Sequence, residues 1–593
     1  MSELSRLFVR ECPCKEEYKQ RLEYELNIID TQNFTRIFII VANLIQKVHC
    51  LYICRGSAAS SLVCYLLGIT HIDPLEHSMN FSRFLNPKRI SQPDIDIDFP
   101  HHLHKQIFDI LYSCYPSQVG RVINHVFYKS KSAWNKALKL TKGTVNAKTF
   151  KISSSLLNQP NYDSIHCGGA VVFSGPVPKP YIHPKQFLRS EKIKDSSKSL
   201  KLKLDKREVE NEGLVKIDLL SNRGLSILQA LDNKRQISDY PALDPKITDL
   251  LNNLDVLGVT FIETPNMIRV IRIIKPDSPI LLSLCLALAR PAPNILNLVN
   301  AKGSSRETNS LQRGSNGTRT QKERILVYDD DMIEQIADWL EIDFSTAESI
   351  RKGLTKNAPG AWDAFKLRLL SRYEVKKVNQ IIEDCQFVRK YSFCKSHSLN
   401  YAYLCWALLW HKAHNRTEFW RAVLNHSQSM YEDWVYFRTI IHEGYSIELT
   451  TKKERNAKTW RTKNNYFYLT DTPKKQSSLD GWVKKDENRE GIIDTDILKV
   501  QQLRTFGYWT GSWISHCRFE PGWCCGIVAT YSTRKFLRNV VTFYSVMVEP
   551  DNMITIICSE GEVQSKNKNI YLIEADITFV QDQVYNSSRY SFL

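Results

Sequence analysis

An alternating run of acidic and apolar residues gives the clearest chemical signal in the sequence. Residues 93–99 read Pro-Asp-Ile-Asp-Ile-Asp-Phe, and the two-residue period of a strand points Asp94, Asp96 and Asp98 to one face. Three neighbouring carboxylates repel one another, and strands are poor in aspartate. Bound cations relieve that repulsion, and carboxylate oxygens suit Mg²⁺ or Mn²⁺. The run therefore predicts a two-metal site for phosphoryl transfer, with a solvated edge strand as the alternative.

A turn of small residues precedes the acidic strand. Residues 54–63 read Cys-Arg-Gly-Ser-Ala-Ala-Ser-Ser-Leu-Val, and we expect the backbone to turn tightly and enter a helix that starts near Ser57. Backbone N–H groups at a helix start, with Arg55 beside them, predict a site for a phosphate. A turn that serves only packing is the alternative.

The elements that position these groups follow from the spacing of apolar residues. Residues 15–30 and 32–49 have helical patterns. Residues 216–219 read Lys-Ile-Asp-Leu, so the alternation places Lys216 and Asp218 on one face of a second strand. If the two strands are neighbours, Asp218 lies next to the acidic run.

The overall composition is that of a soluble, multidomain protein with a polyanionic partner. A chain of 593 residues allows roughly three to five domains. Lys and Arg number 80 against 63 acidic residues, so we expect nucleic acid as partner rather than a membrane surface; a protein that is merely basic is the alternative. The 15 cysteines form no regular framework, and no signal peptide is evident. The apolar run 37–45 is too short to span a bilayer, so we expect a cytoplasmic location.

Further motifs identify a family. Residues 55–99 contain Arg-Gly-Ser-Ala-Ala-Ser-Ser-Leu-Val, Arg-Phe-Leu-Asn-Pro-Lys-Arg and Pro-Asp-Ile-Asp-Ile-Asp-Phe in that order. They resemble the R-G-S-x-A-x-S-L-V, R-F-L-N-P-E-R and P-D-F-D-h-D-F motifs of the bacterial replicative DNA polymerase III alpha subunit, the C family of DNA polymerases. Residues 166–172, 213–220 and 391–398 are similar to the family's H-A-G-G-V-V, G-L-V-K-F-D-F-L and Y-G-F-N-K-S-H-S.

Two segments depart from the family's pattern. Residues 289–293 read Ala-Arg-Pro-Ala-Pro instead of F-R-P-G-P, and residues 328–332 read Tyr-Asp-Asp-Asp-Met where the family has Y-Q-E-Q-V-M. We expect both changes to affect the rate and fidelity of synthesis more than the chemical reaction itself.

The resemblance implies roles for individual residues. Asp94, Asp96 and Asp218 become the catalytic ligands of two Mg²⁺ ions, with Mn²⁺ as an alternative, and Asp98 becomes a supporting residue. The expected contacts to the nucleotide substrate are Arg55, Gly56, Ser57, Arg83, Arg89, Lys216, Arg290, Arg351, Lys352, Lys395 and His397.

The resemblance also implies an α+β multidomain fold: a polymerase-β-like nucleotidyltransferase palm with thumb and helical fingers, and a C-terminal OB-like β-barrel. The expected boundaries are 1–125 for the first part of the palm, 126–164 for a shortened thumb, 165–220 for the second part of the palm, 221–430 for the fingers, 431–505 for a basic connecting region and 506–593 for the OB-like domain. In the last of these, we expect strands near 526–531, 540–548, 553–559 and 570–580.

The implied function is that of a template-directed DNA polymerase that adds deoxynucleotides to a primer 3′ end and releases pyrophosphate. The chain begins where the family's palm begins, so we expect no PHP domain, and we expect no intrinsic proofreading. The implied partners are primer–template DNA, deoxynucleoside triphosphates and a sliding clamp or other replisome proteins. The implied location is a bacterial cell, and a virus or mobile element is one possible source of the gene. The alternatives are a catalytically decayed nucleic-acid-binding relative and a template-independent nucleotidyltransferase.

Overall fold

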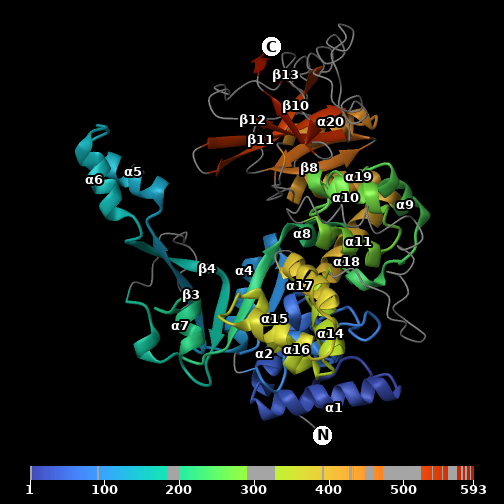
Figure 1. Ribbon diagram of the computed structural model, residues 1–593. Coiled ribbons are helices and arrows are strands. Elements are labelled where there is room, and N and C mark those ends of the chain that lie inside the picture. Colours follow the sequence, from blue (N-terminus) through green and yellow to red (C-terminus); the bar gives the residue numbers. More distant parts are fainter. Residues whose placement is uncertain are drawn as a thin grey trace. The chain divides into compact units, whose positions relative to one another are not determined.

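The computed structural model describes residues 3–89, 92–184, 200–289, 327–389, 393–426, 431, 433–447, 458–463 and 465–471, together with the strands of a sheet between 522 and 592 (Figure 1). The chain forms two compact units. The first comprises Met1–Leu225, Tyr328–Lys390 and Cys394–Asn400, and the second comprises the rest. Each unit is described separately.

A six-stranded sheet is the centre of the first unit, in the order β1-β2-β6-β4-β3-β5. The strands are β1 (Ile53–Arg55), β2 (Ile95–Pro100), β3 (Val119–Phe127), β4 (Pro160–Val172), β5 (Leu200–Lys201) and β6 (Lys216–Asn222). Strand β6 pairs in parallel with β2 and antiparallel with β4. The last strand in the chain therefore lies between two earlier ones.

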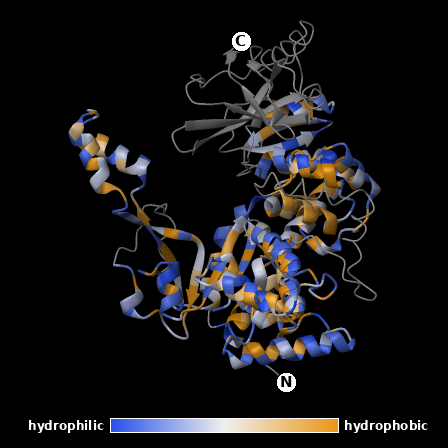
Figure 2. Cartoon of the chain, viewed as in Figure 1, coloured by the Kyte–Doolittle hydropathy of each residue, from blue (hydrophilic) through white to orange (hydrophobic). Residues whose placement is uncertain are grey.

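The apolar residues of the acidic strand anchor it in the core, as its alternation predicts. Ile95, Ile97 and Phe99 are fully buried. They belong to one hydrophobic cluster with residues of β6 and of helices α1 (Glu16–Thr31), α2 (Thr35–Lys47) and α4 (His104–Cys114). Helix α1 also carries many hydrophilic residues, as Figure 2 shows. The helices α1 and α2 confirm the helical patterns at 15–30 and 32–49.

A pair of helices, α5 (Ser130–Leu140) and α6 (Ala147–Leu156), forms an arm between β3 and β4 (Figure 1). The β3–β4 ladder continues to the pair Phe127–Pro160 and leads directly into the arm. The rings of Trp134 and Phe150 pack with their centroids 4.9 Å apart. A short helix, α7 (Lys206–Asn211), follows β5 and lies beside β3.

The rest of the first unit is made of short turns and helices. The 3₁₀ turns η2 (Gly56–Ser60) and η3 (Phe81–Arg83) and helix α3 (Leu62–Leu66) come before β2. Later in the chain come α14 (Asp329–Leu340), α15 (Phe344–Thr355), α16 (Ala361–Leu370) and α17 (Val375–Arg389). Helix α18 (Lys395–His414) begins in this unit and continues into the second.

The described core of the second unit is helical. Its helices are α9 (Pro245–Asn252), α10 (Pro265–Ile274), α11 (Pro279–Leu288), α19 (Arg416–His426) and α20 (Asp433–His442), and α8 (Arg223–Leu231) enters it from the first unit. Helices α9, α10 and α11 each begin with a proline that follows a capping side chain, from Asp244, Thr264 and Ser278. This sequence pattern favours a helix start, because proline needs no N–H partner there.

Two sheets complete the second unit. The smaller contains β7 (Ser446–Ile447), β8 (Lys458–Lys463) and β9 (Tyr466–Asp471). The larger has the order β14-β15-β12-β11-β10-β13-β16. Its strands are β10 (Gly522–Phe536), β11 (Asn539–Glu549), β12 (Asn552–Cys558), β13 (Ile570–Ala575), β14 (Phe579–Val580), β15 (Val584–Ser587) and β16 (Arg589–Phe592). The first four overlap the four strands expected from the sequence; the OB-like barrel itself stays a prediction.

No single helix among the described residues is long and apolar enough to cross a membrane. Helices α1 and α2 reach that length and composition only together, and they are bent by 111° where they meet.

Candidate active site

Three carboxylates from two neighbouring strands come together on the sheet of the first unit. Asp96 lies on β2 in register with Asp218 on β6, and Asp94 immediately precedes β2. One carboxylate oxygen from each of the three lies within 4.8 Å of the others. The structure therefore brings together the three residues for which the sequence predicts metal binding, and we call this group the acidic triad.

The acidic triad is electrostatically strained without a cation. Burial, together with the negative charges of Asp94 and Asp218, raises the pKa of Asp96 to about 7. Lys216 offsets part of this charge, because its Nζ lies 3.3 Å from Asp94 Oδ1 and also contacts Asp218 Oδ2. Burial lowers the pKa of Lys216, but the two carboxylates outweigh burial, and its pKa is raised overall.

The donor set fits a hard divalent cation. Asp96 Oδ1 and Asp218 Oδ1 are buried and accept no hydrogen bond from any residue that the structure describes. A buried carboxylate oxygen without a partner is costly, and coordination to Mg²⁺ or Mn²⁺ would satisfy both oxygens. The three acids are thus suited to hold the metal that the sequence predicts.

Asp98 lies outside the acidic triad. It is buried, its Oδ2 accepts a hydrogen bond of 2.9 Å from Asn222 Nδ2, and its Oδ1 lies 3.5 Å from Arg55 Nε. These contacts agree with the supporting role expected for this residue.

The small-residue turn approaches the acidic triad closely. Gly56 has a φ of +72°, which favours glycine, and a Cβ at this position would lie 3.8 Å from Asp96 Oδ2. Arg55 pairs in register with Asp96, and its Nε lies 3.7 Å from Asp96 Oδ2. A group bound at Gly56 and Ser57 would therefore lie beside the carboxylates.

The helix predicted to start near Ser57 is a short 3₁₀ helix, and the α-helix follows later than expected. A 3₁₀ turn occupies Gly56–Ser60, and α3 begins only at Leu62. The N–H groups of Leu62 and Val63 donate to the buried Glu25 at 3.0 Å each. A carboxylate of the chain thus occupies the helix terminus, and only the 3₁₀ turn is left for an external phosphate.

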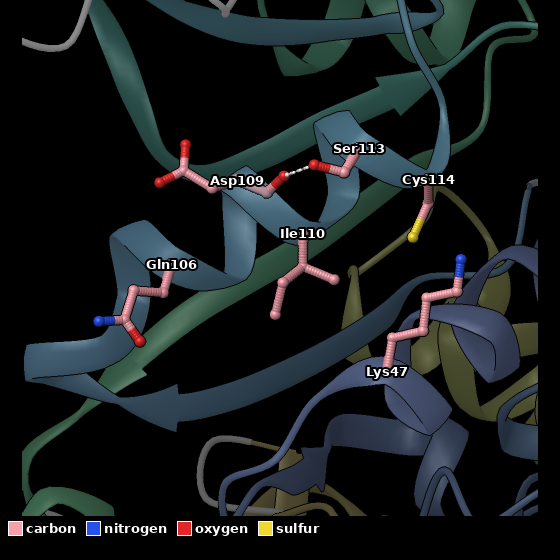
Figure 3. A pocket seen from close by; sticks show the side chains of 6 residues that line it. All are labelled: Lys47, Gln106, Asp109, Ile110, Ser113 and Cys114. Carbon is pink, nitrogen blue, oxygen red and sulfur yellow. Dashed lines mark hydrogen bonds between the residues drawn. The ribbon is translucent and has the colours of Figure 1, made fainter.

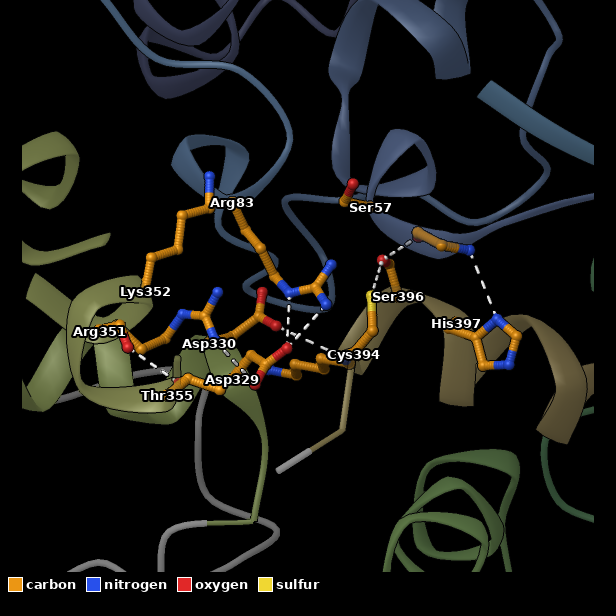
Figure 4. A network of polar contacts seen from close by, with 12 residues as sticks. Ser57, Arg83, Asp329, Asp330, Arg351, Lys352, Thr355, Cys394, Ser396 and His397 are labelled. Carbon is orange, nitrogen blue, oxygen red and sulfur yellow. Dashed lines mark hydrogen bonds and ion pairs between the residues drawn. The ribbon is translucent and has the colours of Figure 1, made fainter. Parts of the chain in front are cut away.

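Two of the predicted phosphate-binding side chains, Arg83 and Arg351, meet at Asp329 (Figure 4). Asp329 Oδ2 accepts hydrogen bonds from Arg83 Nε at 2.9 Å and Nη2 at 2.7 Å, and Asp329 Oδ1 accepts one from Arg351 at 3.1 Å. Arg351 also makes two bonds to Glu348, at 2.6 and 3.0 Å, and Lys352 Nζ lies 3.3 Å from Glu348 Oε1. Each of these cations therefore has an acidic partner within the chain.

The start of α18 holds the Gly56 turn in place (Figure 4). Ser396 Oγ donates to the Gly56 carbonyl at 2.7 Å, and His397 Nδ1 accepts the Gly56 N–H at 3.4 Å. Lys395 Nζ donates to the carbonyl of Ser78 at 3.3 Å. Sequence reasoning selected His397 but missed Ser396, although both belong to the same motif.

The remaining predicted substrate contacts lie elsewhere. Arg89 donates to the backbone carbonyls of Phe84 and Gln92, the latter at 3.0 Å, so in this structure it binds its own chain. Arg290 lies outside the described residues.

His166 is a neighbour of the acidic triad that sequence reasoning did not select. Its Nδ1 lies 3.7 Å from Asp218 Oδ1 and accepts the N–H groups of Gly168 at 3.2 Å and Gly169 at 2.7 Å. A Cβ on Gly169 would lie 2.8 Å from that nitrogen, which explains why glycine suits this position. Burial lowers the pKa of His166. The sequence signal that could have identified His166 is its position as the first residue of the His-Cys-Gly-Gly motif.

The pocket in Figure 3 is separate from this site. It is lined by Lys47 of α2 and by residues of α4, among them Asp109 and Ser113. None of the predicted site residues lines it.

Two family models match the chain. The bacterial DNA polymerase III alpha NTPase domain matches residues 2–149, and the bacterial DNA polymerase III alpha subunit finger domain matches residues 223–376. The first match contains Asp94 and Asp96, and the second contains Arg351 and Lys352.

Curated relatives are polymerases. The chain is 28% identical to the DNA polymerase III subunit alpha of Ureaplasma parvum, over 70% of this chain and 47% of the relative. It is 27% identical to the same subunit of Thermotoga maritima, over 73% and 50%. It is 25% identical to an error-prone DNA polymerase of Corynebacterium glutamicum, over 69% and 42%. The chain spans about half the length of the curated relatives that it matches.

Proposed function

Because the chain is a bacterial DNA polymerase III alpha-like protein, we propose that it is a DNA-directed DNA polymerase. It adds deoxynucleotides to a primer 3′ end and releases pyrophosphate. The observation that carries the proposal is the convergence of Asp94, Asp96 and Asp218 on adjacent strands, in a chain of this family.

The acidic triad would hold two Mg²⁺ ions in this proposal. Such ions activate the primer hydroxyl and neutralise the charge of the triphosphate and the departing pyrophosphate. The three carboxylates fix the place of reaction, because β2 and β6 are hydrogen-bonded neighbours in a buried sheet. Lys216 lies between Asp94 and Asp218 and moderates their repulsion.

The chain's own residues would position the triphosphate. The turn at Gly56 and Ser57 lies beside Asp96 and is held by Ser396 and His397. Arg83 is oriented by two hydrogen bonds to Asp329. In phosphoryl transfer the protein contributes mainly orientation and charge stabilisation, which is what these contacts provide.

The remaining elements take the family's roles in this proposal. The first-unit sheet is the palm, α5 and α6 are the shortened thumb, residues 221–430 are the fingers, and residues 506–593 are an OB-like domain for single strands. The arm carries basic residues, including Lys131, Lys136 and Lys139, that suit contact with a DNA backbone without base reading. Primer–template DNA and deoxynucleotides are the substrates. The location would be a bacterial cytoplasm. There a clamp or other replisome protein would compensate for the weak grip of the short thumb on DNA. Proofreading would come from another protein.

Primer extension with a labelled primer tests the proposal. With Mg²⁺, the chain should extend a primer only when a template strand is present, and product length should follow the template. Extension without template would indicate a template-independent nucleotidyltransferase. DNA binding without extension under any condition would indicate a decayed relative, and either result would overturn the proposal.

A further inference from the structure

A second group of titratable residues lies where the β3–β4 ribbon meets α7, below the helical arm. His125 on β3 pairs in register with Asp163 on β4, and His125 Nδ1 lies 2.6 Å from Asp163 Oδ1. His183 Nε2 lies 3.1 Å from the other oxygen of Asp163. The second ring nitrogen of His125, Nε2, lies 3.2 Å from Glu208 Oε2 on α7. None of these residues belongs to the acidic triad.

The start of α7 supplies two carboxylates to this group. Asp205 accepts the N–H groups of Arg207 and Glu208 at 2.9 Å each, and Glu208 Oε2 accepts the N–H of Asp205 at 2.7 Å. This reciprocal capping box fixes both acidic side chains at one end of the helix. As a result, ligand atoms of His125, Asp205 and Glu208 lie within 4.8 Å of one another.

The orientation of His125 is that of a metal ligand. Metal-binding histidines generally donate one ring N–H to a carboxylate, which fixes the tautomer and directs the other nitrogen at the ion. Asp163 is in place to accept such a bond from His125 Nδ1, which leaves Nε2 facing Glu208 and Asp205. One imidazole with two carboxylates suits Zn²⁺ or Mn²⁺ better than Mg²⁺, which prefers oxygen ligands alone.

We infer that His125, Asp205 and Glu208 form a second divalent-cation site, distinct from the acidic triad, that suits Zn²⁺ or Mn²⁺ better than Mg²⁺. Asp163 positions the His125 ring, and water completes the coordination shell. The three ligands come from β3 and from α7 with its capping residue, so a bound ion joins α7 to the ribbon that carries the arm. All three side chains are partly exposed, which allows the ion to exchange with solvent.

Metal binding by the full chain tests the inference. Asp96→Asn and Asp218→Asn are introduced first, so that the acidic triad no longer competes, and Zn²⁺ binding is measured by equilibrium dialysis in excess Mg²⁺. The variants are His125→Ala and Glu208→Gln; the second is isosteric and keeps an oxygen for the Asp205 N–H. Glu210→Gln, on the same helix but outside the group, is the matched control.

The expected result is one Zn²⁺ ion per chain that excess Mg²⁺ does not displace. Its affinity should fall by about tenfold or more in both His125→Ala and Glu208→Gln and stay unchanged in Glu210→Gln. Absence of bound Zn²⁺ in the parent would overturn the inference. So would equal binding by parent and both variants, or an equal loss in Glu210→Gln, which would indicate unspecific attraction to an acidic helix.

Discussion

Asp96 and Asp218 lie directly opposite each other on the parallel strands β2 and β6, although the whole helical arm separates them in the chain. The register of one ladder thus decides whether their carboxylates meet. A shift by one residue would turn Asp218 to the opposite face of the sheet.

Removal of one carboxylate of the acidic triad should abolish synthesis without unfolding the protein. We expect Asp218→Asn to lower the rate of primer extension by at least about a hundredfold, because Asn keeps the shape of the side chain but loses the charge that attracts a cation. The melting temperature should change little, because relief of repulsion between the acids offsets the weakened ion pair with Lys216. Asp109→Asn, an acidic residue of α4 at the separate pocket, is the control and should retain full activity. Unchanged extension by Asp218→Asn would contradict the assignment.

Gly56 should matter for reasons beyond its backbone conformation. Gly56→Ala places a left-handed conformation on an L-residue and a methyl group beside Asp96, so both stability and activity should fall. Gly360 has the same φ of +72° with open space around it. Gly360→Ala should therefore lose a similar stability, about 1 kcal/mol, and retain activity. Urea denaturation and primer extension measured on both variants separate the general cost of the backbone conformation from an effect on the site.

Asp329 should be a major stabilising residue of the first unit. Asp329→Ala removes the oxygen that accepts both hydrogen bonds from Arg83 and leaves Arg351 with Glu348 alone. Removal of one member of a largely buried ion pair costs about 3 kcal/mol, and we expect a loss of this size in urea denaturation. Glu341, which pairs with Arg372 at 2.9 Å on the surface, is the control, because exposed pairs contribute little. Equal effects of Asp329→Ala and Glu341→Ala would contradict this prediction.

Glu263 should make the second unit less stable as the pH rises. Burial raises the pKa of its carboxyl to about 7, even though Gly258 N–H and Tyr436 Oη–H donate to it at 2.9 and 3.1 Å. The folded state therefore retains a proton that the unfolded state loses at about pH 4.5. The contribution of Glu263 to the free energy of unfolding is therefore complete below about pH 4.5 and is lost as the pH rises to about 7. The total loss is about 3 kcal/mol.

Glu263→Gln should remove this dependence, because its amide does not titrate. Denaturation of the variant measured between pH 4.5 and 7.5 should show a flatter pH profile than that of the parent. Glu443→Gln removes another acid of the same unit and is the control. A parent profile that rises over this interval would contradict the sign.

The acidic strand could be predicted from sequence because its signal is local. The pleat alone separates Asp94 and Asp96 from Ile95 and Ile97, and burial of the isoleucines confirms it. The pairing with Asp218 needed family resemblance, since no local pattern specifies which strands become neighbours.

Contacts between distant segments could not be predicted. Glu25 is fully buried and caps α3, yet in the sequence it is one acid in a charged helix. Asp329 likewise appeared in the sequence only within the departure from the family pattern at residues 328–332, and its role depends on Arg83 and Arg351 approaching from other elements. The polar groups that these contacts satisfy become visible only when the chain is folded.

The position of β6 also has a consequence for folding during synthesis on the ribosome. This strand is the last of its sheet to leave the ribosome, and it must insert between β2 and β4, which are already synthesised. Until β6 has inserted, β2 and β4 each expose an unpaired edge that can pair with strands of other chains. The nascent chain therefore passes through a vulnerable period that ends with the same step that delivers Asp218 to Asp96.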